Sequence, residues 1–252
     1  MKYYTMITLL TIFFSLSNCS KMPTTDVTDA CGNKILTTIE DFSVSLHASS
    51  SIFYRAKFAI DADGSPRAYG PADAGLDLNQ HAITNGEWVG VVVGSDGNPI
   101  EQKATDPHPG LWVSQTSLYD DKFANTDPRR YVDSEKIPYI ALPQTAMALA
   151  GVELGDIAYV FNPETKKSSF AIFADVGPEG LLGEGSIYLA KTLGIANISP
   201  RDGGLSGASI QYIVFPRSGK GNGKHLTISE IDALGRALMK NLGGEAAVLK
   251  CF

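Results

Sequence analysis

Two carboxylates, Asp175 and Glu184, stand nine residues apart in the segment FADVGPEGLLGEGS. An apolar run over 170–174 predicts a strand that ends on Asp175, and a Val-Gly-Pro turn and a glycine-rich loop then carry Glu184 to the front of a helix. This order places both acids at the rim of one strand and loop. A glycosidase needs such a pair, because one group donates a proton and the other acts as base or nucleophile. Two solvated surface acids would show the same spacing.

The elements that must position these acids are mostly strands. Twenty-five glycines and thirteen prolines separate short apolar runs, a composition typical of a β-rich body with many turns. Apolar alternation and β-branched content predict strands over 51–60, 87–93 and 137–142, over 157–161 and 211–215, and over the segment that ends on Asp175. A turn at 95–98 predicts a hairpin whose returning strand starts at 99–102, and the Pro-rich segment 106–118 leads into another strand.

Helices are expected over 144–151, over 186–194 and, most clearly, over 228–242. Thr227 and Glu230 form a capping-box pattern at the start of the last helix, and Gly243-Gly244 stops it. No internal repeat and no linker to a second core is evident, so residues 31–252 are interpreted as one domain.

Charge and motif content narrow the functional classes. The chain has 27 acidic and 21 basic residues, a formal charge of -6, which argues against nucleic acid and favours a cationic substrate. The run Asp61-Ala-Asp63-Gly is not an EF-hand, because Ala72 stands at the twelfth position. The Gly-rich loop 216–224 lacks P-loop spacing, and the histidines show neither metal-ligand spacing nor a nucleophile motif. No metal and no cofactor are expected.

Residues 1–18 have the character of a signal peptide, with Lys2 before a short apolar run. The following Cys19 resembles the lipidated cysteine of a bacterial lipoprotein, and residues 19–30 are interpreted as a tether. Plain cleavage of the signal peptide is the alternative. The protein is therefore expected to be exported, either anchored in a bacterial cell envelope or extracellular, with membrane contact only through a lipid anchor.

The remaining cysteines, Cys31 and Cys251, lie near the two ends of the mature chain. In an oxidising compartment this pair predicts a disulfide that ties the N-terminal arm to the C-terminus. Its role would be stability rather than chemistry.

Several segments together resemble the family 75 glycoside hydrolases, the chitosanases first known from fungi. They are AKFAIDADGSPRAYGP, GLDLNQHAITNGEW, DPHPGLWVSQTSLYD, YIALP, GVELGDIAYV and FADVGPEGLLGEGSIYLAKTLG. The resemblance runs in order from about Lys57 to Phe215, and the step from Asp175 to Glu184 matches the catalytic pair of that family. A shorter likeness to expansins and related peptidoglycan hydrolases indicates a double-psi β-barrel. The expected fold is thus mainly β, with a six-stranded barrel core, added strands and a C-terminal helix.

The resemblance implies endo-hydrolysis of β-1,4-linked glucosamine polymers with inversion. The protein is separately expected to be a monomer. Glu184, on a flexible loop beside Leu181 and Leu182, is expected to be the acid and Asp175 the base, although either order is chemically open. The residues that the resemblance suggests for substrate binding are Asp61, Asp63 and Asp77, which would recognise amines, and Trp88 and Trp112, which would stack on sugars. Turn-forming aspartates and core tryptophans are the plain alternatives.

Two other functions fit the same residues. One is hydrolysis of peptidoglycan or another envelope glycan. The other is a non-catalytic, expansin-like module that binds polysaccharide, in which Asp175 only caps a turn.

Overall fold

A computed structural model describes residues 31–252. The expected signal peptide at 1–18, the tether at 19–30 and the lipidation of Cys19 lie outside the described residues. Within 31–252, no helix combines the length and the apolar character needed to cross a membrane.

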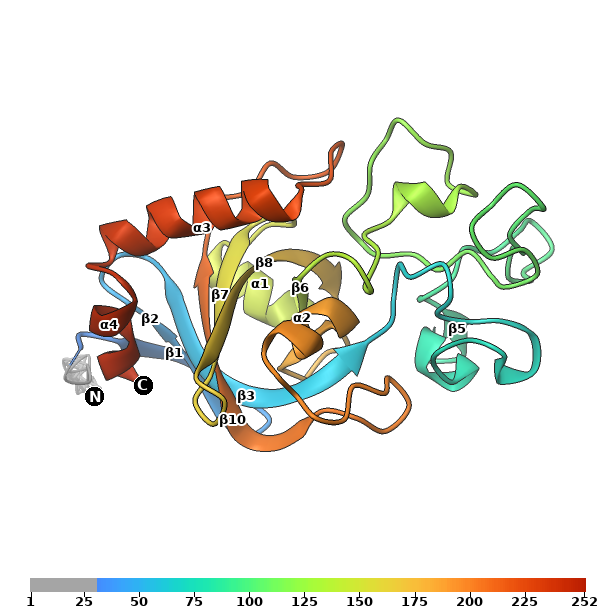
Figure 1. The fold of residues 1–252 in the computed structure, drawn as a ribbon. Coiled ribbons are helices and arrows are strands. Elements are labelled where there is room, and N and C mark those ends of the chain that lie inside the picture. The colour runs from blue at the N-terminus through green and yellow to red at the C-terminus, as the bar shows by residue number, and fades with distance from the viewer. Residues whose placement is uncertain (1–30) are drawn as a thin grey trace, which may run out of the picture.

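Six strands close into a barrel of mixed parallel and antiparallel pairs, which confirms the mainly β fold expected from the sequence (Figure 1). Pairing of β9 with β3 completes the ring. The β9–β3 and β6–β8 pairs are parallel, and the other pairs around the barrel are antiparallel. In spatial order the strands are β3 (Ile52–Asp61), β10 (Leu205–Phe215), β7 (Ile157–Asn162), β8 (Lys167–Val176), β6 (Tyr139–Leu142) and β9 (Glu184–Ser186).

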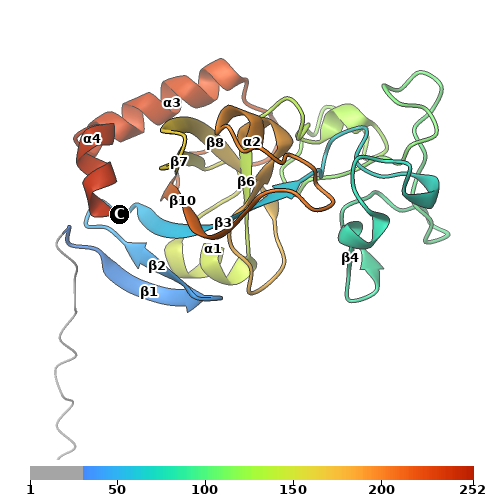
Figure 2. The same cartoon turned by 60° about the horizontal axis from the view of Figure 1, so that its bottom comes forward.

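Alternation along β3 sets which side chains fill the barrel. Tyr54, Ala56, Phe58 and Ile60 are buried in the central core, whereas the residues between them are more exposed. Since side chains of a strand alternate between its faces, Ala59 and Asp61 point to the outer face of the barrel. Their partners in register on β9, Glu184 and Ser186, point to the same face. A hairpin of β1 (Lys34–Ile39) and β2 (Phe42–Leu46) extends the sheet beyond the start of β3 (Figure 2).

Helix α3 (Ile228–Asn241) lies across β7 and β8 and covers a second core cluster (Figure 1). Its capping box of Thr227 and Glu230 is present as predicted. Residues of β8 are buried on both faces, because the barrel interior takes one face and α3 the other. The remaining helices are α1 (Gln144–Ala150), α2 (Ile187–Thr192) and α4 (Glu245–Val248).

The segment between β3 and β6 is an irregular lobe beside the barrel (Figure 1). The strand predicted over 87–93 is wrong: only β5 (Glu87–Trp88) forms there, paired with β4 (Ile83–Thr84). The strands predicted at 99–102 and within 106–118 are also wrong, because isolated bridges replace them. Val91 packs in the central core and Val92 in a separate small cluster. The β-branched run therefore contributes side chains to two cores and does not form a continuous strand.

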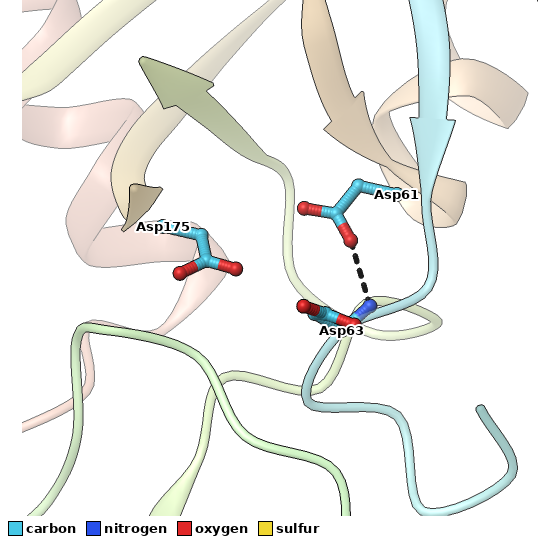
Figure 3. Close-up of side chains that lie close together, drawn as sticks. All are labelled: Asp61, Asp63 and Asp175. Carbon is cyan, nitrogen blue, oxygen red and sulfur yellow. Dashed lines mark hydrogen bonds between the residues drawn. The ribbon is translucent and has the colours of Figure 1, made fainter. Parts of the chain in front are cut away.

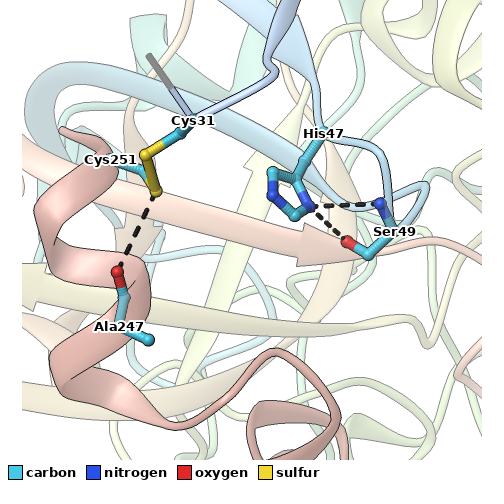
Figure 4. The surroundings of a disulfide bond; sticks show 5 residues. All are labelled: Cys31, His47, Ser49, Ala247 and Cys251. Atoms are coloured by element: carbon cyan, nitrogen blue, oxygen red, sulfur yellow. Dashed lines mark hydrogen bonds between the residues drawn. A yellow bond between two sulfur atoms is a disulfide. The ribbon is translucent and has the colours of Figure 1, made fainter.

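Cys31 and Cys251 are joined by a disulfide, with Cα atoms 5.6 Å apart, beside the turn that follows β2 (Figure 4). The bond closes a sequence separation of 220 residues. It ties the N-terminal edge of the described chain to the C-terminal segment that follows α4.

Candidate active site

Strand register brings Asp175 and Glu184 together. On β6, Ala141 is aligned with Asp175 of β8 on one side and with Glu184 of β9 on the other. Glu184 is in turn aligned with Ala59 of β3. Residues directly in register point to the same face of a sheet, so both acids project from one face of the barrel wall, two strands apart.

A β-bulge in β8 gives Asp175 this direction. Between Ile140 and Ala141 the β6 strand advances one residue, whereas β8 advances from Phe173 to Asp175. The extra residue is Ala174. Without it, Asp175 would share the inward face of Phe173; with it, the carboxyl turns to the face of Glu184. Bulges commonly re-aim a side chain in this way.

The two acids open onto a cleft of about 710 Å³ between the barrel wall and the irregular lobe. Adjacent strands lie about 4.8 Å apart, so two strand spacings put the Cα atoms of Asp175 and Glu184 about 10 Å apart. Three further aspartates that the sequence suggested line the same cleft, namely Asp61, Asp63 and Asp77.

Asp61, Asp63 and Asp175 form a compact carboxylate cluster at one end of β3 and β8 (Figure 3). One carboxylate oxygen from each lies within 4.8 Å of the others. The Asp61 carboxylate accepts a hydrogen bond of 2.8 Å from the Asp63 main-chain N–H, and the Asp63 carboxylate accepts one of 2.7 Å from the Tyr69 hydroxyl. Such an oxygen set suits a hard cation or an ammonium group. The part of the chain that the structure describes offers this cluster as its candidate metal site, whereas no metal was expected from the sequence.

Burial raises the pKa of Asp61, Asp63, Asp175 and Glu184, and repulsion by neighbouring acids adds to the shift at all of them except Asp175. Desolvation raises the pKa of Asp175 to about 6 and, with the charge of Asp175, the pKa of Glu184 to about 7. Burial, followed by the charges of neighbouring acids, holds the pKa values of Asp61 and Asp63 well above their ordinary range. Several of these groups therefore share protons near neutral pH.

Asp175 and Glu184 differ in their partners. Asp175 is 8% exposed, and its Oδ1 accepts hydrogen bonds from the Ser117 N–H and hydroxyl and from the Val176 N–H, at 2.9, 2.7 and 2.8 Å. These donors favour the ionised carboxylate and oppose the effect of burial. Within residues 31–252, no comparable hydrogen-bond donors reach the Glu184 carboxyl: desolvation is the largest effect on its pKa, and the Lys57 charge opposes it.

Glu184 lies in strand β9 and not in the flexible loop that the sequence suggested. Ser186, the last residue of the same strand, caps α2 by accepting a hydrogen bond from Leu189 N–H. Gly177 lies against the carboxylate: a Cβ at this position would be 2.3 Å from Glu184 Oε2. The absence of a side chain at Gly177 therefore leaves space for the acid.

Asp77 lies further along the cleft and orients a histidine. Its Oδ1 accepts hydrogen bonds of 2.7 Å from the Leu78 N–H and from His81 Nδ1. The Asp77 residue is buried and the His81 side chain is 39% exposed. Burial raises the pKa of Asp77, whereas the hydrogen bonds from the Leu78 N–H and from His81 lower it in part.

The structure does not bring the two tryptophans into the cleft. Among the residues described, Trp88 and Trp112 pack edge-to-face with ring centroids 5.2 Å apart and lie against the central core. Sequence reasoning also missed Ser117, Gly177 and His81 as residues that shape the site. Gly177 could have been predicted, because it lies in the turn between the two acids. Ser117 could not, because it is distant from Asp175 in the sequence and contacts it only in the folded protein.

The fold and the site together define an acid-rich cleft on the wall of a closed β-barrel. No protein-family model matches the sequence. A search of curated proteins likewise finds no match.

Proposed function

We propose that this protein is an exported glycoside hydrolase that cleaves β-1,4-linked glucosamine polymers such as chitosan by inversion. The observation that carries the proposal is the shared face of Asp175 and Glu184, a buried and a half-buried carboxyl with raised pKa values in one cleft. Buried acids perturbed by desolvation and by each other are typical of catalytic sites. The ordered sequence resemblance to family 75 chitosanases supports the same assignment.

The environments of the two acids support a division of roles. Glu184 has the higher pKa, about 7, and its surroundings favour the neutral form, so it donates the proton to the glycosidic oxygen. Asp175, with a pKa of about 6 and three hydrogen-bond donors on Oδ1, stays ionised more readily and accepts a proton from the attacking water. Inversion requires carboxyls about 6.5–9.5 Å apart, so that water and sugar fit between them. The two-strand separation is compatible with that spacing.

The other acids of the cleft support an amino-sugar substrate. Asp61, Asp63 and Asp77 add negative charge beside the catalytic pair, and an ammonium group on the sugar would relieve their repulsion. A polymer with one ammonium group per sugar residue offers such a charge at each binding position.

One observation, the hydrogen bonding around Asp175, favours an alternative function, a non-catalytic module that binds polysaccharide. The hydrogen bonds from Ser117 and Val176 to Asp175 Oδ1 also cap the end of β8, which is a structural role that needs no chemistry. A module of this kind would bind glycan without releasing reducing ends.

Release of reducing ends from chitosans of graded acetylation, with peptidoglycan alongside, distinguishes these functions. Asp175→Asn and Glu184→Gln should each abolish turnover while the fold persists in circular dichroism. The matched controls are Asp41→Asn and Glu164→Gln, exposed acids outside the cleft, which should leave turnover unchanged. Turnover at the parent rate in either site variant contradicts the assignment of the pair. Polymer binding without any reducing ends would favour the binding module.

A further inference from the structure

The cleft continues past Asp175 into a second hollow. This hollow has a volume of about 330 Å³, and both Asp175 and Val89 line it as well as the acidic cleft. Asp175 therefore stands where the two spaces meet. A polymer that crosses the catalytic acid would place successive sugars in two different environments.

The two environments differ in charge. The acidic cleft is lined by seven carboxylates and one arginine, Arg201, so acids strongly outnumber bases there; the acids are Asp61, Asp63, Asp77, Asp175, Glu179, Glu184 and Asp202. Among the residues that the structure describes, the second hollow is lined by one acid, Asp175, and one arginine, Arg130, so its charges balance. A substrate ammonium group would be attracted by the excess of acids in the acidic cleft but repelled by Arg130 in the second hollow.

The hollow holds its polar groups in fixed positions. The Arg130 guanidinium stacks on the Tyr119 ring at 4.0 Å from the centroid, and its Nη1 donates to the Phe123 carbonyl at 2.6 Å. The Gln115 side-chain amide donates through Nε2 to the Val89 carbonyl at 2.8 Å, which leaves the Gln115 amide oxygen as an acceptor. Fixed donors and acceptors favour recognition of a ligand group with matching polarity.

Val89 adds an apolar contact to this set. It is 48% exposed and lines the hollow together with the polar groups just described. A guanidinium donor, an amide acceptor and an isopropyl group complement the carbonyl oxygen, the N–H and the methyl group of an acetamide. Asp175 lines the same hollow, and its negative charge disfavours a carboxylate there.

We propose that this second hollow is a subsite for an N-acetylated amino sugar. The inference rests on the proposed function. It makes the preferred substrate a partly acetylated chitosan, cleaved between a sugar that carries an acetamido group and one that carries a free amine. Arg130, Gln115 and Val89 determine this specificity, whereas Asp175 and Glu184 perform the hydrolysis.

The test compares hydrolysis of fully deacetylated and partly acetylated chitosan and identifies the sugars at the newly formed ends by mass spectrometry. One of the two new ends should be enriched in N-acetylglucosamine. In Arg130→Ala, the ratio of kcat/KM for the acetylated over the deacetylated polymer should fall about tenfold, since a charged hydrogen bond is lost. Gln115→Ala should lower the same ratio, which keeps the test valid if the first variant folds poorly.

Arg129→Ala is the matched control, because Arg129 is the neighbouring arginine, pairs with Asp127 on the surface and does not line the hollow. It should leave the ratio unchanged. Random acetylation at both new ends, or an unchanged ratio in both Arg130→Ala and Gln115→Ala, overturns the subsite and leaves the proposed function standing. Cleavage confined to glycans with a carboxylate-bearing sugar overturns the acetamide in favour of an anion. Failure to release ends from any chitosan overturns the proposed function itself.

Discussion

Gly177→Ala should separate catalysis from stability. A Cβ added to Gly177 would lie 2.3 Å from Glu184 Oε2, whereas ordinary contacts begin near 3.4 Å. The carboxylate must therefore move by about 1 Å, the difference between these two distances. Gly177 has no left-handed backbone conformation, so alanine adds no backbone strain there.

A displacement of about 1 Å in a catalytic group costs on the order of 100-fold in rate. We expect kcat on chitosan to fall by about this factor, while the free energy of unfolding changes by less than about 1 kcal/mol, because alanine also restricts the unfolded chain. Reducing-end kinetics and urea unfolding measure the two quantities.

Gly94→Ala provides the matched control for this variant. Its added Cβ would lie 2.8 Å from Oδ1 of the exposed Asp96, again a carboxylate oxygen beside a glycine with ordinary backbone angles, but outside the cleft. It should leave kcat unchanged. Parent-like turnover in Gly177→Ala would refute the role of Glu184 as the positioned acid, and an equal loss in Gly94→Ala would refute the steric reasoning.

The pH dependence of kcat/KM should be bell-shaped, falling below about pH 6 as Asp175 becomes protonated and above about pH 7 as Glu184 ionises; a flat profile from pH 4 to 9 contradicts the pair. Because its pKa is raised to about 6 from 3.8 in the fold, Asp175 destabilises the protein progressively as pH rises through this interval. Asp175→Asn should therefore be more stable than the parent at pH 8, by up to about 3 kcal/mol in urea unfolding, and not at pH 4; equal stability at pH 8 contradicts the buried charge. Replacing Cys31 and Cys251 by serine should lower the free energy of unfolding by at most about 5 kcal/mol, because the bond closes a long loop. It should leave kcat unchanged, because neither cysteine lines the cleft; a lost kcat in the folded double variant would contradict a purely stabilising role.

Barrel strands and helices were predictable where local pattern and final environment agree. The β3 segment alternates buried and exposed residues, and the α3 segment carries both its cap and its amphipathic period. In both elements, the tertiary packing requires the same secondary structure that the local sequence favours. The predicted strand over 87–93 failed because β-branched content signals burial without specifying a partner strand.

The acids of the candidate site were predictable from the sequence, but its other residues and its geometry were not. Asp175 and Glu184 follow from an apolar run, a turn and the resemblance, whereas Asp61 and Asp63 follow only from the resemblance. Their meeting depends on the Ala174 bulge and on the order of β8, β6, β9 and β3, which are long-range properties. Ser117 shows the limit most clearly, since 58 residues separate it from the carboxylate that it orients.

The energetic cost of the site supports a functional explanation for it. Asp61, Asp63, Asp175 and Glu184 are desolvated, and electrostatic repulsion adds to the raised pKa of three of them, so neutral side chains of similar size would fold more stably. Hydrogen bonds compensate for part of this cost at Asp175, and shared protons relieve another part. An incoming ammonium group would relieve the rest, and glycoside hydrolysis by inversion requires one carboxyl that donates a proton to the glycosidic oxygen and one that takes a proton from water. The same electrostatic repulsion that destabilises the fold around the cleft would therefore favour both substrate binding and catalysis.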